Sequence, residues 1–438
     1  MSLSGNRTFV GFGFGAIQAG LFLYEAHRSG NFRRLVVAEV QPGVVKALRD
    51  ASGRYWVNVA HQDHIEAEEI GPIEIVNPET EEGAQLLVKA VTEAEEIATA
   101  LPSVRFYSTQ SPGSIHRILA EGLTQKAASE GPPAVIYAAE NNNTAAETLE
   151  AEVFRVVPEG QPDKVRARVR FLNTVIGKMS GVVVEPDEMR ARQLRPVTPN
   201  GNRAFLVEAF NRIFISRIHF DEPNLSFHRG ITVFEEKDNL LPFEEAKLYG
   251  HNATHALAAY VGMMRGVKQI SDLKETPGTL PFLEAAFVDE SGGALIAQNR
   301  GMDPLFTSHG YRAYAEDLLV RMFNPFLGDT VERVGRDAAR KLGWDDRLIG
   351  TIRVGLQHGI AMRRFGFGAA AAACVLDPAA LRSKDTLESV LAPIWDQASP
   401  DGAEKRRVQD VMEQGRQDLR LWREKEFPHL ENFIQGRK

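Results

Sequence analysis

The chain has 438 residues, of which 25% are charged and 43% hydrophobic, and its formal net charge is -7. This length predicts two domains, and the composition supports packed cores rather than disorder. The acidic balance argues against a general nucleic-acid binder, which needs a basic face. The one cysteine, Cys374, allows no disulfide within the chain and fits a reducing compartment. Without a signal peptide or a run approaching about 20 apolar residues, we expect a soluble cytoplasmic protein outside the membrane.

The first predicted elements are a strand, a tight glycine turn, a helix and a second strand. The strand RTFVGF (7–12) is rich in β-branched and aromatic residues, and the helix that follows ends at Gly30, a typical C-cap residue. The segment RRLVVAEV (33–40) has the pattern of a buried strand. Strand-like PSVRFYST (102–109) and PAVIYAAE (133–140) flank a predicted helix over 114–128. TEAEEIATA (92–100) is interpreted as a solvated helix surface.

Strands that alternate with helices predict a parallel, doubly wound sheet of the Rossmann type. Four strand-like runs between about 165 and 236 are interpreted as an extension of this sheet: VRARVRFLNTVIG, GVVVEP, RIFISRIHF and GITVFEE. Beyond residue 240 the pattern is mostly helical. We therefore predict a Rossmann-type α/β domain with extended mixed strands over 1–240, followed by a mostly α-helical domain over 241–438.

The turn GFGFGA fits the G-x-G-x-x-G/A fingerprint of dinucleotide-binding folds. We expect Gly11 to permit the tight turn, Gly13 to let the backbone approach a pyrophosphate, and Ala16 to allow close packing of the helix. The N–H groups at the start of that helix would bind the phosphates. An incidental glycine-rich turn is the alternative, but the flanking strand and helix favour a cofactor site. The predicted cofactor loop comprises Gly11, Phe12, Gly13, Phe14, Gly15 and Ala16.

The second predicted strand ends in an acidic residue, Glu39, at the distance that the fingerprint requires. Its carboxylate could accept hydrogen bonds from the ribose 2′-OH of NAD, and it would repel the 2′-phosphate of NADP. No lysine or arginine follows it before Lys46. The sequence therefore favours NAD over NADP.

The segment KLYGHNATH (247–255) combines an amine, an amide and two imidazoles. In a regular α-helix at about 100° per residue, His251, His255 and Asn252 would lie about 40°, 80° and 140° from Lys247, on one broad face. A neutral lysine can act as a general base, an asparagine N–H can stabilise an alkoxide, and a histidine can orient a hydroxyl. These groups suit oxidation of a secondary alcohol by hydride transfer. A solvated lysine and a core histidine are the alternative, which the upstream fingerprint disfavours.

Two other features are expected to carry no chemistry. HQDH (61–64) offers a pair of histidines but no evident third ligand, so we expect no metal. Cys374 lies in a run of small residues and is expected to be packed and inert.

With these motifs in place, the sequence from residue 8 to about 375 resembles the polyol-specific long-chain dehydrogenase (mannitol dehydrogenase) family. Lys247, Asn252 and His255 match the family's K-x4-N-x2-H, and this resemblance implies that the lysine is the catalytic acid/base and the asparagine part of an oxyanion pocket. The stretch AAENNN matches a second family asparagine, Asn141, after Glu140. Gly177 and Lys178 depart from the Asp-Arg that the family commonly has, which leaves the substrate open.

The stretch from Arg321 to Gly350 resembles the sugar-phosphate branch of the family, in which Arg321 matches an arginine near the substrate hydroxyls. Arg333, Arg336 and Arg340 are spaced so that a continuous helix would align them, and such a cluster suits a phosphate dianion. The alternative is a solvated helix face on which these arginines pair with neighbouring acids, which are Glu332, Asp337, Asp345 and Asp346.

The resulting hypothesis is a metal-independent, NAD-dependent enzyme that interconverts D-mannitol 1-phosphate and fructose 6-phosphate. In it Lys247 removes the alcohol proton, Asn141 and Asn252 stabilise the oxygen, and His255 and Arg321 hold neighbouring hydroxyls. One alternative is a dehydrogenase of a non-phosphorylated polyol or a hexuronate. Another is an NAD(H)-binding sensor without catalysis. Small molecules are the expected partners, and the protein is expected to be a monomer or a small homo-oligomer.

Overall fold

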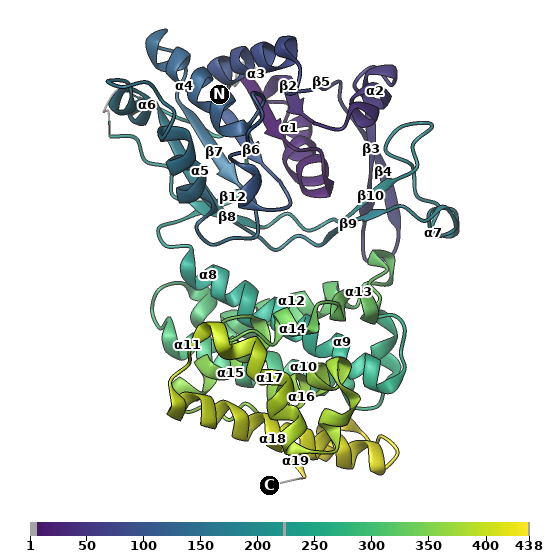
Figure 1. Cartoon of the computed structure of the whole chain (residues 1–438). Helices are drawn as coiled ribbons and strands as arrows, with labels where there is room; N and C mark the ends of the chain where they lie inside the picture. Colours follow the sequence, from purple (N-terminus) through teal and green to yellow (C-terminus); the bar gives the residue numbers. More distant parts are fainter. Residues whose placement is uncertain (1–6, 222–224, 437–438) are drawn as a thin grey trace. The chain divides into compact units, whose positions relative to one another are not determined.

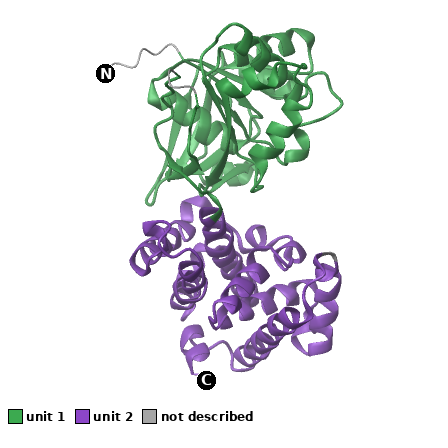
Figure 2. Cartoon of the chain, turned by 90° about the vertical axis from the view of Figure 1, so that its left-hand side faces the viewer, with its two compact units in different colours: residues 1–241 green, residues 242–438 purple. Residues whose placement is uncertain are grey.

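The computed structural model describes residues 7–221 and 225–436. The chain divides into two compact units, Met1–Leu241 and Pro242–Lys438, which Figure 2 shows in different colours. All strands of the described residues belong to the first unit, and the second unit is built from helices. The predicted fold class, a Rossmann-type sheet followed by a helical domain, is confirmed.

The main sheet of the first unit has eight strands in the order β12-β11-β8-β7-β6-β1-β2-β5 (Figure 1). From β5 to β8 all neighbouring strands are parallel, whereas β11 is antiparallel to β8 and parallel to β12, as expected for a mixed extension. Its strands are β1 (Arg7–Phe12), β2 (Phe32–Ala38), β5 (Glu74–Val76), β6 (Glu96–Thr99), β7 (Ala134–Ala138), β8 (Val169–Ile176), β11 (Ile213–Ser216) and β12 (Phe234–Lys237).

A second, four-stranded sheet has the order β4-β3-β10-β9. Its strands are β3 (Tyr55–Ala60), β4 (Ile65–Ile70), β9 (Ser180–Val183) and β10 (Ala204–Glu208). The prediction that GVVVEP extends the main sheet was therefore wrong. The Lys178 amine explains the change of sheet, because it donates hydrogen bonds to the carbonyls of Glu208 and Phe210 and so holds the start of β9 beside β10.

Two further predictions were wrong: the solvated helix surface over residues 92–100 and the strand over residues 102–109. Residues Glu96–Thr99 form β6, which is buried throughout and lies in the middle of the main sheet, and Val104–Phe106 form a short 3-10 helix. Glu96 was predicted to be exposed because a carboxylate is rarely buried unless it is paired. Here it accepts a hydrogen bond of 2.9 Å from the Tyr137 hydroxyl and another from the Gly230 N–H, partners that the local pattern does not reveal.

Helices cover both faces of the main sheet (Figure 1). One apolar core joins β-strand residues such as Val10 and Val36 to α3 and α4, and the other joins Phe9 to the first helix and to the second sheet. The first helix ends at Gly30, whose φ of 66° confirms the predicted C-cap, and α4 begins after Ser114. The helices of this unit are η1 (Gln18–Phe22, a π-helix), α1 (Leu23–Ser29), α2 (Pro42–Asp50), α3 (Glu81–Glu93), η2 (Val104–Phe106), α4 (Ile115–Ala128), α5 (Ala145–Phe154), α6 (Pro162–Arg168) and α7 (Pro186–Ala191).

The helical unit is centred on α16 (Arg363–Leu376), whose run of alanines and glycines is buried. These small residues let α18 (Gly402–Glu424) approach closely: a Cβ on Gly415 would lie 2.2 Å from the Gly366 carbonyl oxygen. Cys374 is buried here, and burial raises the pKa of its thiol to about 11, as expected for a packed cysteine. In the described part of the chain, no helix has the length and apolar character that crossing a membrane requires.

The elements of this unit up to α13 are α8 (Leu241–Glu245), η3 (Ala246–Asn252), α9 (Ala253–Arg265), η4 (Ser271–Glu275), α10 (Thr279–Ala285), η5 (Ala286–Gly292), α11 (Gly293–Gln298), η6 (Pro304–Phe306), α12 (Ser308–Met322), η7 (Pro325–Leu327) and α13 (Val331–Gly335). They are followed by α14 (Ala338–Lys341), α15 (Arg347–Gln357), α16 (Arg363–Leu376), η8 (Pro378–Leu381), α17 (Lys384–Trp395), η9 (Asp396–Ala398), α18 (Gly402–Glu424) and α19 (Leu430–Gln435).

Candidate functional site

The glycine turn connects β1 to the first helix, and two of its glycines are required by the backbone. Gly13 has a φ of 87°, and a Cβ there would lie 2.9 Å from the carbonyl oxygen of Ala100. A Cβ on Gly11 would lie 2.1 Å from Nε2 of Gln18. By contrast, a Cβ on Gly15 would meet no atom within 4 Å. The turn thus presents an open stretch of backbone at Gly15, close to the start of a helix, which suits a phosphate.

The two phenylalanines of the turn are core residues. Phe12 and Phe14 are 1% and 3% exposed, and they belong to the two opposite cores of the sheet. The Phe14 ring packs edge-on against Tyr55 and Phe205 of the second sheet. Their backbone rather than their side chains is therefore available to a cofactor. Ala16 is also buried, as its predicted packing role requires.

Glu39 lies directly after β2 and is held in place by the backbone. Its N–H donates to the Val76 carbonyl at 2.9 Å, and its Oε1 accepts from the Gln41 N–H at 2.8 Å. Its second carboxylate oxygen carries no such bond among the described residues. The carboxylate is thus fixed while part of it is able to accept hydrogen bonds from a ribose.

Arg203 was not among the predicted site residues, yet the fold brings it within electrostatic range of Glu39. Burial lowers the pKa of Arg203, and the charge of Glu39 acts in the opposite direction. The guanidinium lies 5.3 Å from the ring centroid of Phe205, which in turn packs on Phe14 of the glycine turn. Its Nη2 is buried without a hydrogen-bond partner in the part of the chain that the structure describes. No local signal could have found it, because Arg203 precedes β10, far along the chain.

The charges of Glu39 and Arg203 predict how a substitution changes the preference for NAD over NADP. The Glu39→Ala variant is expected to narrow the preference for NAD over NADP by about tenfold or more, because it removes the repulsion of a 2′-phosphate and leaves Arg203 able to bind one. The ratio of kcat/KM for the two cofactors measures this. Glu74→Ala, which removes an exposed acid of the neighbouring β5 that pairs with Arg34, is the control and should leave the ratio unchanged. An unchanged ratio in Glu39→Ala would contradict the role of the carboxylate.

The segment that carries the predicted lysine base is a π-helix, η3. A π-helix has more residues per turn than an α-helix, so Lys247 and Asn252 are separated by less than the about 140° that a regular α-helix would give. Gly250 is required here because a Cβ would lie 2.6 Å from the Tyr311 hydroxyl and 2.9 Å from the Phe287 ring. The Tyr249 carbonyl accepts a hydrogen bond from the Thr351 hydroxyl at 3.1 Å. Packing and this external hydrogen bond therefore favour the π turn.

The Lys247 amine is placed for proton transfer near neutral pH. Burial lowers its pKa to about 8; the charge of Glu244 acts against this shift, and that of Arg347 adds to it. Its side chain nevertheless keeps partial solvent exposure, so a substrate could reach it. Among the described residues no hydrogen bond or ion pair engages the amine. The positive charge of Arg347, at the start of α15, lowers the pKa of the amine further and so favours its neutral form.

Three further basic groups surround the same segment. His251 is buried; its burial holds its pKa well below the usual range, and the charges of His255, Arg321 and Lys247 act in the same direction. The rings of His251 and His255 are nearly parallel, with centroids 6.1 Å apart. Arg321 is 8% exposed and lies 3.2 Å from Asp317. The structure therefore gathers Lys247, Asn252, His255 and Arg321 in one region of the helical unit.

A buried carboxylate, Asp329, lies beside the His255 ring. Its Oδ2 lies 3.3 Å from Nε2 of His255, and its Oδ1 forms an ion pair with Arg333. Asp329 is 6% exposed, and it lies just before α13. A carboxylate that fixes an imidazole ring is a recurrent way of positioning a histidine for catalysis. Sequence analysis did not assign Asp329 to the site, although it lies within the segment that carried the family resemblance.

The predicted continuous helix through the arginine cluster was wrong. The chain breaks between α13 and α14, where Arg336 has an extended ψ of 159° and Asp337 has a φ of 57°. Arg333, Arg336 and Arg340 are all exposed, and they do not share one helix face. Arg340 lies 3.5 Å from Asp346, and Arg333 pairs with Asp329, so acids already engage two of the three.

The second predicted asparagine, Asn141, is exposed and lies in the loop after β7, in the first unit. The preceding Glu140 is buried, and it accepts hydrogen bonds of 2.9 Å from Thr99 Oγ1 and from the Leu101 N–H. Glu140 thus fixes the end of β7 against the end of β6. Lys178, which replaces a common family residue, is a structural amine that also donates to Asn211 Oδ1 at 2.7 Å.

Two family models match the sequence: the mannitol dehydrogenase Rossmann domain over residues 7–227 and the mannitol dehydrogenase C-terminal domain over residues 239–418. A mannitol-1-phosphate 5-dehydrogenase of Bacillus licheniformis is 28% identical over 363 residues, which cover 82% of this chain and 85% of that relative.

Two solved structures share the fold along nearly the whole chain. Pseudomonas fluorescens mannitol 2-dehydrogenase, in a ternary complex with NAD and D-mannitol, superposes with a TM-score of 0.68 at 16% identity, covering 99% of this chain and 94% of that one. A substrate-free D-sorbitol dehydrogenase superposes with a TM-score of 0.73 at 12% identity, covering 99% and 96%. The first family model covers the unit with the glycine turn, and the second covers η3 with its lysine. The chain belongs to the mannitol dehydrogenase family.

Proposed function

We propose that this protein is an NAD-dependent dehydrogenase that interconverts a sugar alcohol phosphate and a ketose phosphate, most simply D-mannitol 1-phosphate and fructose 6-phosphate. The observation that carries the proposal is the Lys247 amine, whose pKa is lowered to about 8 and which shares a π turn with Asn252. The similarity to a mannitol-1-phosphate 5-dehydrogenase supports the choice of substrate.

The first unit fits the proposed cofactor. Gly15 leaves backbone open to a pyrophosphate, and Glu39 offers a carboxylate oxygen to a ribose hydroxyl. NAD bound at this turn would supply the acceptor for the hydride that leaves the carbinol carbon. The side chains of this protein would transfer the proton, stabilise the substrate oxygen and bind the neighbouring hydroxyls.

In polyol oxidation, the neutral Lys247 amine takes the hydroxyl proton and becomes an ammonium. The amide N–H group of Asn252 donates to the oxygen as negative charge develops on it. His255, held by Asp329, and Arg321 bind the neighbouring hydroxyls and fix which carbon faces the cofactor. In ketose reduction the ammonium returns the proton.

A substrate panel tests the proposal. Reduction of fructose 6-phosphate and fructose, and oxidation of mannitol 1-phosphate and mannitol, are followed by NADH absorbance. We expect kcat/KM to be at least about tenfold higher for each phosphorylated substrate, because one charge-assisted hydrogen bond contributes about 1.5–3 kcal/mol. NADH binding without turnover on any polyol, hexuronate or phosphorylated sugar would instead identify a sensor.

A dehydrogenase of a non-phosphorylated polyol is the second candidate, and one observation favours it. The arginines expected to bind phosphate are exposed, do not share a helix, and are in part paired with Asp329 and Asp346. In that case the panel would show comparable or higher kcat/KM for mannitol and fructose.

The two candidates also predict different effects of neutralising the arginines. For a phosphate site, the Arg333→Gln/Arg336→Gln double variant should raise KM for fructose 6-phosphate by about 10- to 100-fold and KM for fructose much less. Arg312→Gln, which breaks an exposed pair with Glu284 in the same unit, serves as the control. The double variant also removes the ion pair between Arg333 and Asp329, and this loss should affect both sugars alike. Equal changes of KM for fructose 6-phosphate and fructose would therefore contradict a phosphate contact.

A further inference from the structure

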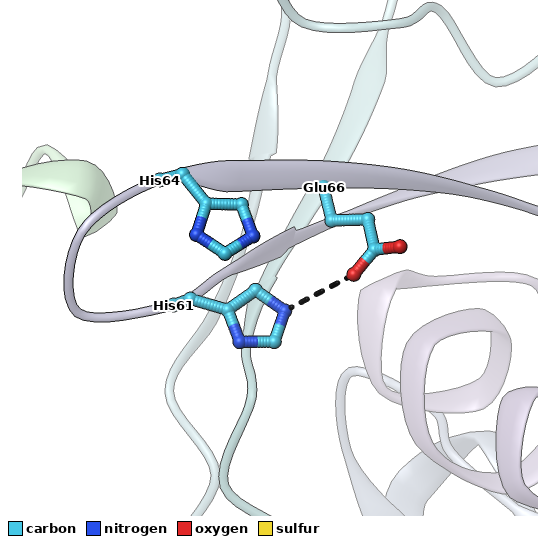
Figure 3. Close-up of side chains that lie close together, drawn as sticks. All are labelled: His61, His64 and Glu66. Atoms are coloured by element: carbon cyan, nitrogen blue, oxygen red, sulfur yellow. Dashed lines mark ion pairs between the residues drawn. The ribbon is translucent and has the colours of Figure 1, made fainter.

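A β-hairpin of the second sheet brings two histidines together outside the region described above. Strands β3 and β4 are antiparallel, Ala60 faces Ile65, and the His61 N–H donates to the His64 carbonyl at 2.9 Å across the turn. The two imidazole rings lie nearly parallel, with their centroids 4.6 Å apart and an angle of 5° between the planes (Figure 3). The hairpin backbone therefore fixes their separation.

Glu66 adds a third ligand type on the same side of the hairpin. Side chains of alternate strand residues share a face, so Glu66 points to the side of His64, as Figure 3 shows. Its Oε2 lies 3.5 Å from Nε2 of His61. One nitrogen from each histidine and one oxygen from Glu66 all lie within 4.8 Å of one another. The expectation that HQDH lacks a third ligand was therefore wrong, although alternation along the strand would have indicated Glu66.

A carboxylate also contacts the second histidine. Oδ1 of Asp63 lies 2.7 Å from Nδ1 of His64. In metal sites, such a carboxylate holds the ring in place, fixes its tautomer and raises its basicity as a ligand. Here it would leave Nε2 of His64 to face an ion.

We propose that His61, His64 and Glu66 bind a divalent transition-metal ion, with Zn²⁺ as the best match. Two imidazoles and one carboxylate suit zinc, nickel or copper, whereas Mg²⁺ and Ca²⁺ prefer oxygen ligands. Tetrahedral zinc with bonds of about 2.1 Å needs neighbouring ligand atoms about 3.4 Å apart. The three side chains are partly exposed and can close by the remaining distance. Water completes the coordination.

Such an ion would join the end of β3 to the start of β4. The folded hairpin holds the three ligands together, so the ion should bind the folded chain more tightly than the unfolded one, and the stability of the first unit would rise with the logarithm of the zinc concentration above Kd. The site takes no part in the lysine chemistry, so its presence does not depend on the proposed enzymatic function.

The experiment uses the full chain, treated with a chelator and then desalted into a buffer that does not bind metals. Zn²⁺ is titrated in by calorimetry, and the melting temperature is measured with and without it. We expect one equivalent of zinc, a rise in melting temperature, and no response to Mg²⁺. His61→Ala, His64→Ala and Glu66→Gln should each weaken binding at least tenfold, and the double histidine variant should abolish it.

The matched control is His219→Ala, which removes another exposed histidine of the first unit that lies beside an aspartate. This variant should bind zinc as the wild type does. Co²⁺ gives a second readout, because its visible absorption reports coordination by nitrogen and oxygen without any need for activity. Retention of the zinc equivalent in the double histidine variant, or no zinc uptake by a wild-type chain that circular dichroism shows to be folded, would overturn the proposal.

Discussion

The Lys247→Ala variant is expected to lower kcat for polyol oxidation by about 10²- to 10⁴-fold while NADH binding stays unchanged. In the proposed mechanism the amine takes the proton, and burial lowers its pKa to about 8, so far more of it is neutral near physiological pH than of an ordinary lysine. The glycine turn and Glu39, which would bind the cofactor, lie in the other unit of the chain. Steady-state kinetics and NADH fluorescence titration measure the two properties separately.

The same pKa sets the direction of the pH dependence. Oxidation needs the neutral amine, so its rate should rise with pH through about 8, whereas reduction needs the ammonium and should fall over that range. Lys268→Ala, which removes an exposed lysine of the same unit, is the control and should preserve both profiles. A Lys247→Ala enzyme with near-normal turnover, or with the pH profile of the wild type, would exclude this lysine as the base.

The Asp329→Ala variant is expected to have the second-largest effect. Asp329 is buried and contacts both His255 and Arg333, so its loss frees the imidazole and leaves polar groups without a partner. We expect the free energy of unfolding to fall by about 1–3 kcal/mol and kcat/KM to fall by about 10²-fold through misplacement of the substrate. Chemical denaturation and kinetics with two substrates that differ only in the phosphate measure these changes.

Asp345→Ala provides the comparison, because Asp345 pairs with Arg353 but its side chain is 77% exposed. An exposed ion pair contributes about 0–1 kcal/mol, and Asp345 should not affect kcat/KM. If Asp329→Ala lost stability but kept kcat/KM, Asp329 would only hold α13 in place. Partial recovery of activity in Asp329→Asn, which can still accept a hydrogen bond from the imidazole, would support its role in positioning His255.

The local sequence pattern correctly predicted those helices, strands and caps that are determined by neighbouring residues in the chain. The first βαβ unit, the C-cap at Gly30 and the helix after Ser114 followed from apolar spacing and from residues with strong turn or cap preferences. The glycine turn followed from a motif in which each glycine has a steric reason. The segment KLYGHNATH attracted attention because Gly250 and Asn252 are poor helix formers, and the structure gives the reason for Gly250 in its contacts with Phe287 and Tyr311.

The predictions were wrong where residues distant in the sequence form hydrogen bonds to a buried polar group or determine which strands pair. The carboxylate of Glu96 suggested a solvated surface, but Tyr137 and Gly230 pair with it inside the sheet. The second sheet joins β3 and β4 to strands more than a hundred residues later in the chain, and no local signal encodes that pairing. The arginine cluster looked aligned only because a continuous helix was assumed across Asp337, which has a positive φ.

The sequence by itself determined the Rossmann-type fold, the helical second half, the cofactor turn with Glu39 and the candidate base, because these depend on periodicity and on residue types at fixed spacing. Only the tertiary structure decided that Lys247 and Asn252 share a π turn, that Asp329 lies beside His255, that Arg203 approaches Glu39, and that Glu66 joins two histidines. Each of these depends on packing or on hydrogen bonds between separate segments. The free energy of such contacts is gained only once the chain has folded, so no local pattern reports it.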